Sequence, residues 1–307
     1  MAGGGGSSYF PRQRVKFRRL VEKTVEETEL RGLDAEVGDY LQTVLAKVNE
    51  RQSDKVQRYI DEIAQILGGD QEIEKFLFGG SVAKHTFVDG LSDIDALVIL
   101  NRAGLEGKTP VEVLRDFFDS LDASLLRDKV QKVSVGKLAV TVSYEDGIEL
   151  QLLPAIRRGD SVCISDADGG SWKTINPKVF QRDLTKANER LNNALVPAIK
   201  LAKSLLSDLP AEIRPTGYHV EALSVEATKG YRGPKTVKSL LQHILTASIS
   251  RVREPVADTT SQSRHIDANL GKKNSQQREK LSLAIAAIAR RMNAASTVDR
   301  WKEIIGF

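Results

Sequence analysis

Apolar positions in the first part of the chain follow a helical period. Residues 12–33 are highly charged with scattered apolar positions, whereas 35–50 and 53–67 carry apolar residues every three or four positions. Because this spacing places apolar side chains on one side of a helix, the pattern predicts three helices with packing faces. The pair Gly68-Gly69 is expected to end the third helix, since glycine favours the position after a helix end.

Shorter apolar runs and a change of period predict strands in the middle of the chain. The runs at 76–78 and 96–100 are short and lie between turn residues, which is typical of buried strands. Residues 133–142 alternate between apolar and small or polar positions, and residues 148–153 follow a Glu-Asp-Gly turn at 145–147. This arrangement predicts a hairpin.

Proline and glycine divide the rest of the chain. Thr109 precedes a proline, which predicts a capped helix that begins there and ends near residue 127. Residues 157–173 are polar and rich in glycine, which predicts a loop. The longest predicted helix then covers 176–207, with a bend expected at Pro197. Further helices are predicted around residues 218–223, 235–251 and 276–295.

The composition is that of a soluble globular protein with one large domain or two closely packed ones. The chain has 307 residues, of which 41% are hydrophobic and 28% charged, and no apolar run has the length of a membrane span. We expect a flexible tail at 1–11, because this glycine-rich segment lacks the apolar core of a signal peptide. We expect a sheet-containing lobe at 12–175, which includes the N-terminal helices, followed by a helical lobe at 176–307.

Charge and cysteine content limit the classes of function. The net charge of +4 fits an anionic ligand such as a nucleotide, but it is weak support for a broad nucleic-acid-binding surface. The single cysteine, Cys163, excludes an internal disulfide framework and a zinc cluster built from cysteines, and it favours a reducing cytoplasm. The four histidines are not spaced as zinc ligands.

The stretch between the two apolar runs combines two features of nucleotide chemistry. The turn Gly79-Gly80-Ser81 follows the first predicted strand and offers backbone N–H groups and a hydroxyl, which suit a phosphate. Asp93 and Asp95 open the second strand two residues apart, so their carboxylates share a face. Such a pair is costly without a cation, and Mg²⁺ prefers carboxylate oxygens together with substrate phosphates. These features predict nucleotidyl transfer.

Other candidate residues are less specific. A third oxygen ligand is expected from a neighbouring strand, where Glu149 is the only acid and shares a face with Gln151. Lys203 is one of several bases on the long helix, and one that faces the cleft would bind a triphosphate, although most helix lysines are solvated. Tyr218 would stack on a base, but a half-buried core tyrosine is the more ordinary role.

These residues resemble the nucleotidyltransferase superfamily of the DNA polymerase beta type, whose signature is a Gly-Ser turn, an Asp-x-Asp pair and a later strand acid. The chain is similar in five ordered blocks to bacterial CD-NTases: FGGSVAKHTFVDGLSDIDALVIL, DGIELQLLPAI, SWKTINP, IKLAKSLL and GYHVEAL. CD-NTases are the enzymes of CBASS anti-phage systems, related to cyclic GMP-AMP synthase and oligoadenylate synthase. The resemblance implies an α+β fold, in which a small mixed sheet with helices faces a helical lobe and the NTP lies between them.

The resemblance also implies roles. Gly80 and Ser81 would hold the β- and γ-phosphates of an NTP such as ATP, Lys203 would meet the triphosphate, and Tyr218 would approach the base. The product would be a cyclic or short linear oligonucleotide that activates a separate effector protein in the cytoplasm. A regulatory partner protein also fits this family, and a membrane does not.

The predicted metal site departs from the family pattern at one position. Asp93 and Asp95 would bind two Mg²⁺ or Mn²⁺ ions, but the place of the usual third acid is taken by Gln151, which we therefore count among the nucleotide-contacting residues. Glu149 lies one repeat earlier on the same face, about 6 to 7 Å along the strand. It is the expected substitute as catalytic acid and third metal ligand.

Three other functions stay open at this point. The first is a transferase that modifies RNA, tRNA or protein, for which the modest net charge is unfavourable. The second is a nucleotide sensor with weak or no catalysis, which Gln151 would explain. The third is a helical interaction protein, which leaves the ordered blocks without a purpose.

Overall fold

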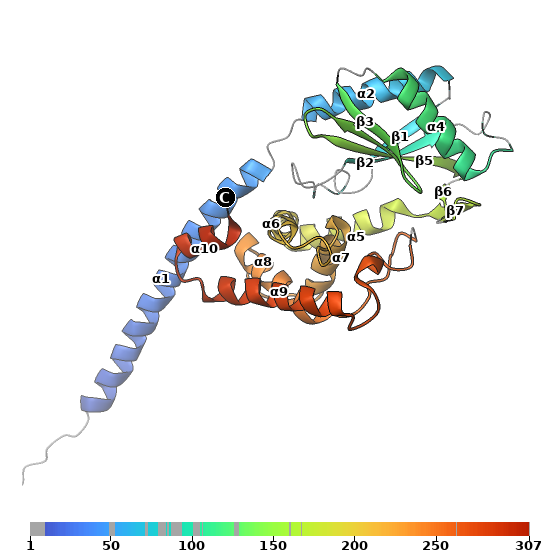
Figure 1. Cartoon of the computed structure of the whole chain (residues 1–307). Coiled ribbons are helices and arrows are strands. Elements are labelled where there is room, and N and C mark those ends of the chain that lie inside the picture. The colour runs from blue at the N-terminus through green and yellow to red at the C-terminus, as the bar shows by residue number, and fades with distance from the viewer. Residues whose placement is uncertain are drawn as a thin grey trace, which may run out of the picture.

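The computed structural model describes residues 10–48, 53–70, 73–78, 94–100, 107–125, 129–159, 161–166, 168–261 and 263–306, with the single positions 84, 86 and 105. This part of the chain forms a sheet lobe, a helical lobe and a long first helix (Figure 1). The fold is α+β, as predicted. No helix in these ranges is both long and apolar enough to cross a membrane.

The sheet lobe contains the predicted mixed sheet. Its strands are β1 (Ile73–Phe78), β2 (Ile94–Leu100), β3 (Val130–Val135), β4 (Val140–Tyr144), β5 (Glu149–Arg158), β6 (Ser161–Ser165) and β7 (Trp172–Ile175). The order is β1-β2-β5-β4-β3, with β6 on the second half of β5 and β7 on β6. Only β2 and β5 pair in parallel among these strands. The predicted hairpin joins β4 to β5, where Gly147 takes a positive φ of 83°.

The helices follow the predicted pattern in most places. They are α1 (Phe10–Val48), α2 (Ser53–Asp70), α4 (Pro110–Ser124), α5 (Pro177–Arg190), α6 (Leu195–Ser207), α7 (Gly217–Ala227), α8 (Val237–Arg251), α9 (Gln276–Ala294) and α10 (Val298–Ile305). Thr109 caps α4 as predicted, in a reciprocal capping box with Glu112. The first two predicted helices are a single one, α1, and α2 continues through Gly68-Gly69 to Asp70.

The two faces of the sheet have different neighbours. Val98 of β2 belongs to the core that the sheet shares with α2 and α4, whereas Ile99 belongs to a separate cluster with β6 and β7. Figure 1 shows α2 and α4 on one side of the sheet and the helical lobe on the other. Because side chains alternate along a strand, positions 95 and 151 belong to the face opposite α2 and α4. The predicted site is therefore on the side of the helical lobe.

The predicted loop at 157–173 is wrong over much of its length. β5 continues to Arg158, and Gly159, with a φ of 59°, turns the chain into β6. The apolar residues Val162 and Ile164 of β6 are buried, with Cys163 between them. The sequence did not predict this strand for two reasons. Glycine and charged residues around the turn favoured a loop, and the apolar run of three residues is too short to show the alternation that is typical of a strand.

The predicted helix at 176–207 is two helices. α5 ends at Arg190 and α6 begins at Leu195, because Asn192 and Asn193 adopt left-handed φ values of 55° and 61°. The expected bend at Pro197 is absent, since this proline lies in the first turn of α6, where a missing backbone N–H breaks no helical hydrogen bond.

The long first helix packs on the helical lobe and not on the sheet lobe, where we had placed it. Val37, Leu41 and Val44 are buried in the same core as α5 to α10. The N-terminal half of α1 runs away from the body of the protein (Figure 1). Residues 1–9 of the predicted tail lie outside the described residues, and Phe10 already begins α1.

Candidate functional site

The register of the two central strands places the predicted site residues of the sheet. Gly80, Ser81 and Asp93 lie outside the described residues, and Asp95 is described only as a position in β2. In the parallel pair, Asp95 is the register partner of Gln151 and Ile94 is that of Leu150. Neighbouring strands lie about 4.8 Å apart, so Gln151 is beside position 95.

Glu149 opens β5 on the same face as Gln151. Leu150 is the register partner of Ile94. Glu149 directly precedes Leu150 in the chain, and Asp93 directly precedes Ile94. The exposed Glu149 carboxylate accepts a hydrogen bond of 2.8 Å from the Ser143 hydroxyl of β4, on the side of β5 away from β2. This carboxylate is therefore accessible but turned toward β4.

Metal binding at this edge would depend on oxygen ligands. Among the side chains that the structure describes, no group of three or more histidine, cysteine, aspartate or glutamate residues is arranged to hold a metal. The positions that do meet at the start of β2 and β5 carry carboxylates and one amide, and their oxygens suit Mg²⁺. The residue types at these positions therefore fit a magnesium ion.

A buried charge cluster ties the segment between β1 and β2 to the helical lobe. We call Lys84, Thr86, Lys203 and Glu221 the Glu221 cluster. One carboxylate oxygen of Glu221 lies 2.7 Å from the Lys203 ammonium and accepts from the Thr86 hydroxyl, and the other oxygen pairs with Lys84. Lys203 also donates to the Thr86 carbonyl oxygen at 2.9 Å. Glu221 is 1% exposed, so its charge is balanced by these lysines and not by water.

Lys203 thus lies inside the protein in this structure, at 6% exposure. The start of α7 is closely packed against it, because a Cβ on Gly217 would be 3.3 Å from the Lys203 ammonium. Its predicted contact with a triphosphate stays a prediction. What the geometry adds is that Lys203 holds Thr86, which lies between Ser81 and β2 in the chain.

Tyr218 lies beside the Glu221 cluster, at the start of α7. Its ring meets the Phe180 ring edge-on, with centroids 4.9 Å apart, and the Lys84 ammonium is 4.7 Å from its centroid. Its hydroxyl donates to Asp258 at 3.2 Å. Burial, assisted by Asp258, raises the pKa of Tyr218 to about 12, so the hydroxyl remains a donor at physiological pH.

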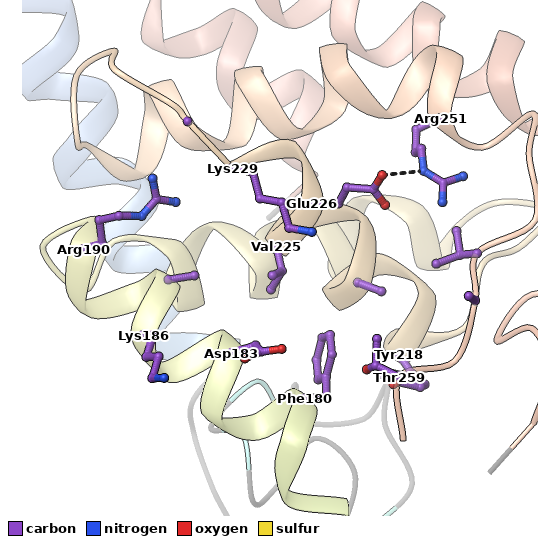
Figure 2. A pocket seen from close by; sticks show the side chains of 15 residues that line it. Phe180, Asp183, Lys186, Arg190, Tyr218, Val225, Glu226, Lys229, Arg251 and Thr259 are labelled. Carbon is purple, nitrogen blue, oxygen red and sulfur yellow. Dashed lines mark hydrogen bonds and ion pairs between the residues drawn. The ribbon is translucent and has the colours of Figure 1, made fainter. Parts of the chain in front are cut away.

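A cavity of about 710 Å³ opens next to Tyr218 and Phe180, between α5, α7 and the segment after α8 (Figure 2). Tyr218, Phe180 and Val225 give it aromatic and aliphatic walls. Charged residues also line it: Asp183, Lys186, Arg190, Glu226, Lys229 and Arg251. Volumes of about 300 to 1,000 Å³ are usual for small-molecule sites, so a nucleoside fits.

The chain also matches a known domain family. Residues 36–188, about half of the chain, match the Second Messenger Oligonucleotide or Dinucleotide Synthetase domain, abbreviated SMODS. The chain belongs to this family of nucleotidyltransferases, the bacterial CD-NTases. The sequence-based family assignment is thereby confirmed. No curated protein matches the chain by sequence.

Solved structures of CD-NTases share the fold. Escherichia coli MS115-1 CdnC with ATP has a TM-score of 0.66 at 16% identity, covering 87% of this chain and 97% of that chain. Bradyrhizobium diazoefficiens CdnG with GTP has a TM-score of 0.60 at 17% identity, covering 89% and 97%. The Vibrio cholerae di-nucleotide cyclase DncV with ATP and GTP has a TM-score of 0.61 at 11% identity, covering 96% and 90%.

A second buried charge group in this CD-NTase includes His219, the residue after Tyr218 in α7. Arg278, fully buried, pairs with Asp267 at 2.6 Å and donates to the carbonyl oxygen of Gly271. His219 lies 3.4 Å from Asp267, and burial lowers the pKa of His219 to about 4, although Asp267 opposes this. The imidazole is therefore neutral in the folded protein at pH 7.

The neutral imidazole predicts a loss of stability in mild acid. The unfolded chain takes up a proton at His219 near pH 6.5, whereas the folded chain does so only near pH 4, so the unfolded state binds more protons in between. The free energy of unfolding should fall as pH drops from 6.5 to 4, by up to about 3 kcal/mol. Urea titrations across this range test it; His219→Phe should flatten the slope, and an unchanged slope would contradict the assignment.

Sequence reasoning missed Lys84, Glu221, Asp183 and Asp258 as site residues. Glu221 is three residues after Tyr218, a spacing that places both on adjoining faces of one helix, and this was the available signal. Asp258 accepts backbone N–H bonds from Thr260 and Ser263 at 2.8 Å each, so it fixes the connector that holds the Tyr218 hydroxyl.

Proposed function

We propose that this CD-NTase joins NTPs into a cyclic or short linear oligonucleotide messenger. A 2′- or 3′-hydroxyl of one nucleotide attacks the α-phosphate of another, and pyrophosphate leaves. The observation that carries the proposal is the Glu221 cluster, in which Lys84 and Thr86, from between β1 and β2, are held against α6 and α7. A nucleotide with its phosphates at that segment then has Tyr218 and the cavity within reach.

The proposed roles divide between phosphate and metal binding. Gly80 and Ser81 donate hydrogen bonds to the β- and γ-phosphates, and Asp93 and Asp95 hold Mg²⁺, or Mn²⁺ in its place. The bound ions would lower the pKa of the attacking hydroxyl and stabilise charge on the α-phosphate and the leaving pyrophosphate. The protein contributes position, because an in-line attack needs both nucleotides fixed before the reaction.

The remaining roles concern charge and the base. Lys203 contributes positive charge beside the triphosphate, and Tyr218 meets the base. We propose Glu149 as the third metal ligand, because it opens β5 in register with the start of β2. Gln151, beside position 95, supplies an uncharged oxygen or a donor to the nucleotide.

Replacement of Glu149 tests the third ligand. Glu149→Gln should slow pyrophosphate release from NTPs at least about tenfold, which corresponds to about 1.4 kcal/mol of barrier, because the metal loses a charged ligand. Ser143→Ala, which removes the hydroxyl now bonded to Glu149, should change the rate less than about threefold, within ~0.7 kcal/mol. A slow Gln151→Ala variant together with an unaffected Glu149→Gln variant would assign the third ligand to Gln151.

Product analysis tests the proposed function itself. Pure protein incubated with all four NTPs and Mg²⁺ or Mn²⁺ should release pyrophosphate and yield an oligonucleotide whose mass identifies its bases and ring. Transfer of label to RNA or protein, without such a product, would assign the chain to the polymer-modifying transferases. The messenger would activate a separate effector of anti-phage defence in the cytoplasm, with control by a partner protein; CdnC is known in complex with HORMA.

A nucleotide sensor is the second candidate, and Gln151 is the observation that favours it. A site with one carboxylate fewer holds metal less strongly, while its phosphate turn and base wall remain. Calorimetry that detects NTP binding, together with no pyrophosphate under either metal, would establish a sensor.

A further inference from the structure

The cavity beside Tyr218 has one charged acceptor that no other described group uses. We infer that Asp183 reads the base of the bound nucleotide and selects guanine; this inference rests on the proposed nucleotide site. Asp183 lies on α5, three residues after Phe180, so both residues face the same groove. Figure 2 shows its carboxylate turned toward Phe180, inside the cavity.

The other charged residues of the cavity are accounted for in two ways. Glu226 is paired with Arg251 at 2.9 Å, and the Arg190 guanidinium donates to the Thr228 carbonyl oxygen at 2.6 Å. Lys229 reaches over Val225 in Figure 2, with no carboxylate of the described chain within 4 Å of its ammonium. Lys186, on α5 with Asp183, likewise has no carboxylate of the described chain within 4 Å. Among the described residues, the cavity therefore offers one unpaired acceptor, Asp183, and two lysine donors, Lys186 and Lys229.

The aromatic wall orients a base in this space. The two rings are nearly perpendicular, so a base that stacks on the face of one meets the edge of the other; this fixes the plane of the base and directs one of its edges to α5 and α7. The hydrogen-bonding partners on those helices then decide which edge is accepted. Because Asp183 comes from the helix that also carries Phe180, its distance from the stacked base is set by the backbone of α5.

Only guanine offers two adjacent donors on its pairing edge. Its N1–H and N2 amino group match the two oxygens of a carboxylate, which accepts only, and its O6 is an acceptor suited to a lysine. Adenine and cytosine would place a ring-nitrogen acceptor against the carboxylate, and uracil has a single donor between two carbonyl groups. These bases should bind less tightly, because the Asp183 carboxylate would give up its water and face a lone pair of the base instead of a donor.

Binding measurements with three purine nucleotides test this inference. Without divalent metal, the dissociation constant of GTP should be at least about tenfold lower than that of ATP, the scale of one good bidentate contact. ITP, which lacks the 2-amino group, should bind less tightly than GTP. In Asp183→Asn, GTP should weaken about tenfold and ATP by less than threefold, and the difference between GTP and ITP should disappear.

Two controls separate recognition from a general effect on the fold. Asp208→Asn changes an exposed aspartate outside the cavity and should leave all three constants unchanged. The melting temperature of Asp183→Asn should equal that of the parent, because Asp183 is exposed. Equal affinities for GTP and ATP, or equal weakening of both by Asp183→Asn, would overturn guanine selection alone; absence of any NTP binding would overturn the proposed function as well.

Discussion

Replacing Asp93 and Asp95 together with alanine should abolish oligonucleotide synthesis and leave the protein folded. Loss of both acids removes the proposed metal site, and the attacking hydroxyl and the leaving pyrophosphate lose their stabilisation; we expect at least a ~1,000-fold fall in rate, or about 4 kcal/mol of barrier. Stability should be unchanged or higher, because two neighbouring carboxylates without a cation repel each other. Pyrophosphate release and urea denaturation measure the two quantities.

A matched pair of acids provides the control for this double variant. Asp119 on α4 and Asp168 before β7 are both exposed and lie away from the start of β2. Their joint replacement with alanine removes the same charge and should leave the rate within about twofold, under ~0.5 kcal/mol. Synthesis that survives loss of Asp93 and Asp95 would remove these acids from the mechanism.

Periodicity and caps made much of the fold predictable. The helical stripes, the apolar runs of β1 and β2, the Thr109 cap and the turn at Gly147 are local signals, and each gave an element of the right type. The errors lie where the local signal was weak. The Asn192-Asn193 turn interrupts an apolar stripe without glycine or proline, and only the left-handed backbone of two asparagines ends α5.

Strand register and contacts between residues distant in the sequence were less predictable. The sequence identified Asp95, Glu149 and Gln151 as members of strands, but the parallel register that puts Gln151 beside position 95 is a tertiary property. The contact between Lys84 and Glu221 joins residues 137 positions apart. Buried charges follow no period, so the presence of Glu221 in α7 gave no sign of two lysine partners.

Glu221→Gln should lower the free energy of unfolding by about 3 to 5 kcal/mol, the usual cost of removing one partner of a buried charge pair. The substitution keeps the shape of the side chain but leaves Lys203, at 6% exposure, and Lys84 without their counter-charge. Urea denaturation at pH 7 measures the loss. Glu226→Gln on the same helix is the control, because its pair with Arg251 is partly exposed and should contribute less than about 1 kcal/mol.

A double variant that removes the charges of both Lys203 and Glu221 distinguishes the effect of charge balance on stability from an effect on catalysis. In Lys203→Met with Glu221→Leu, apolar side chains of similar volume replace Glu221 and one of its two lysine partners, and such replacements are often neutral or stabilising. Lys84 still lacks its counter-charge, so about half of the lost stability should return. If Glu221→Gln and Glu226→Gln lowered the free energy of unfolding equally, this would instead mean that water reaches both Lys84 and Lys203.

The rescued variant then reports on the proposed site. If Lys203 only held the segment after β1, a stable Lys203→Met, Glu221→Leu protein would regain its rate along with its fold. We expect it to remain slow, with a KM for NTP raised about tenfold or more, because a triphosphate beside the Glu221 cluster loses one compact positive charge. Full recovery of both KM and rate would restrict Lys203 to a structural role and leave the phosphates to Gly80 and Ser81.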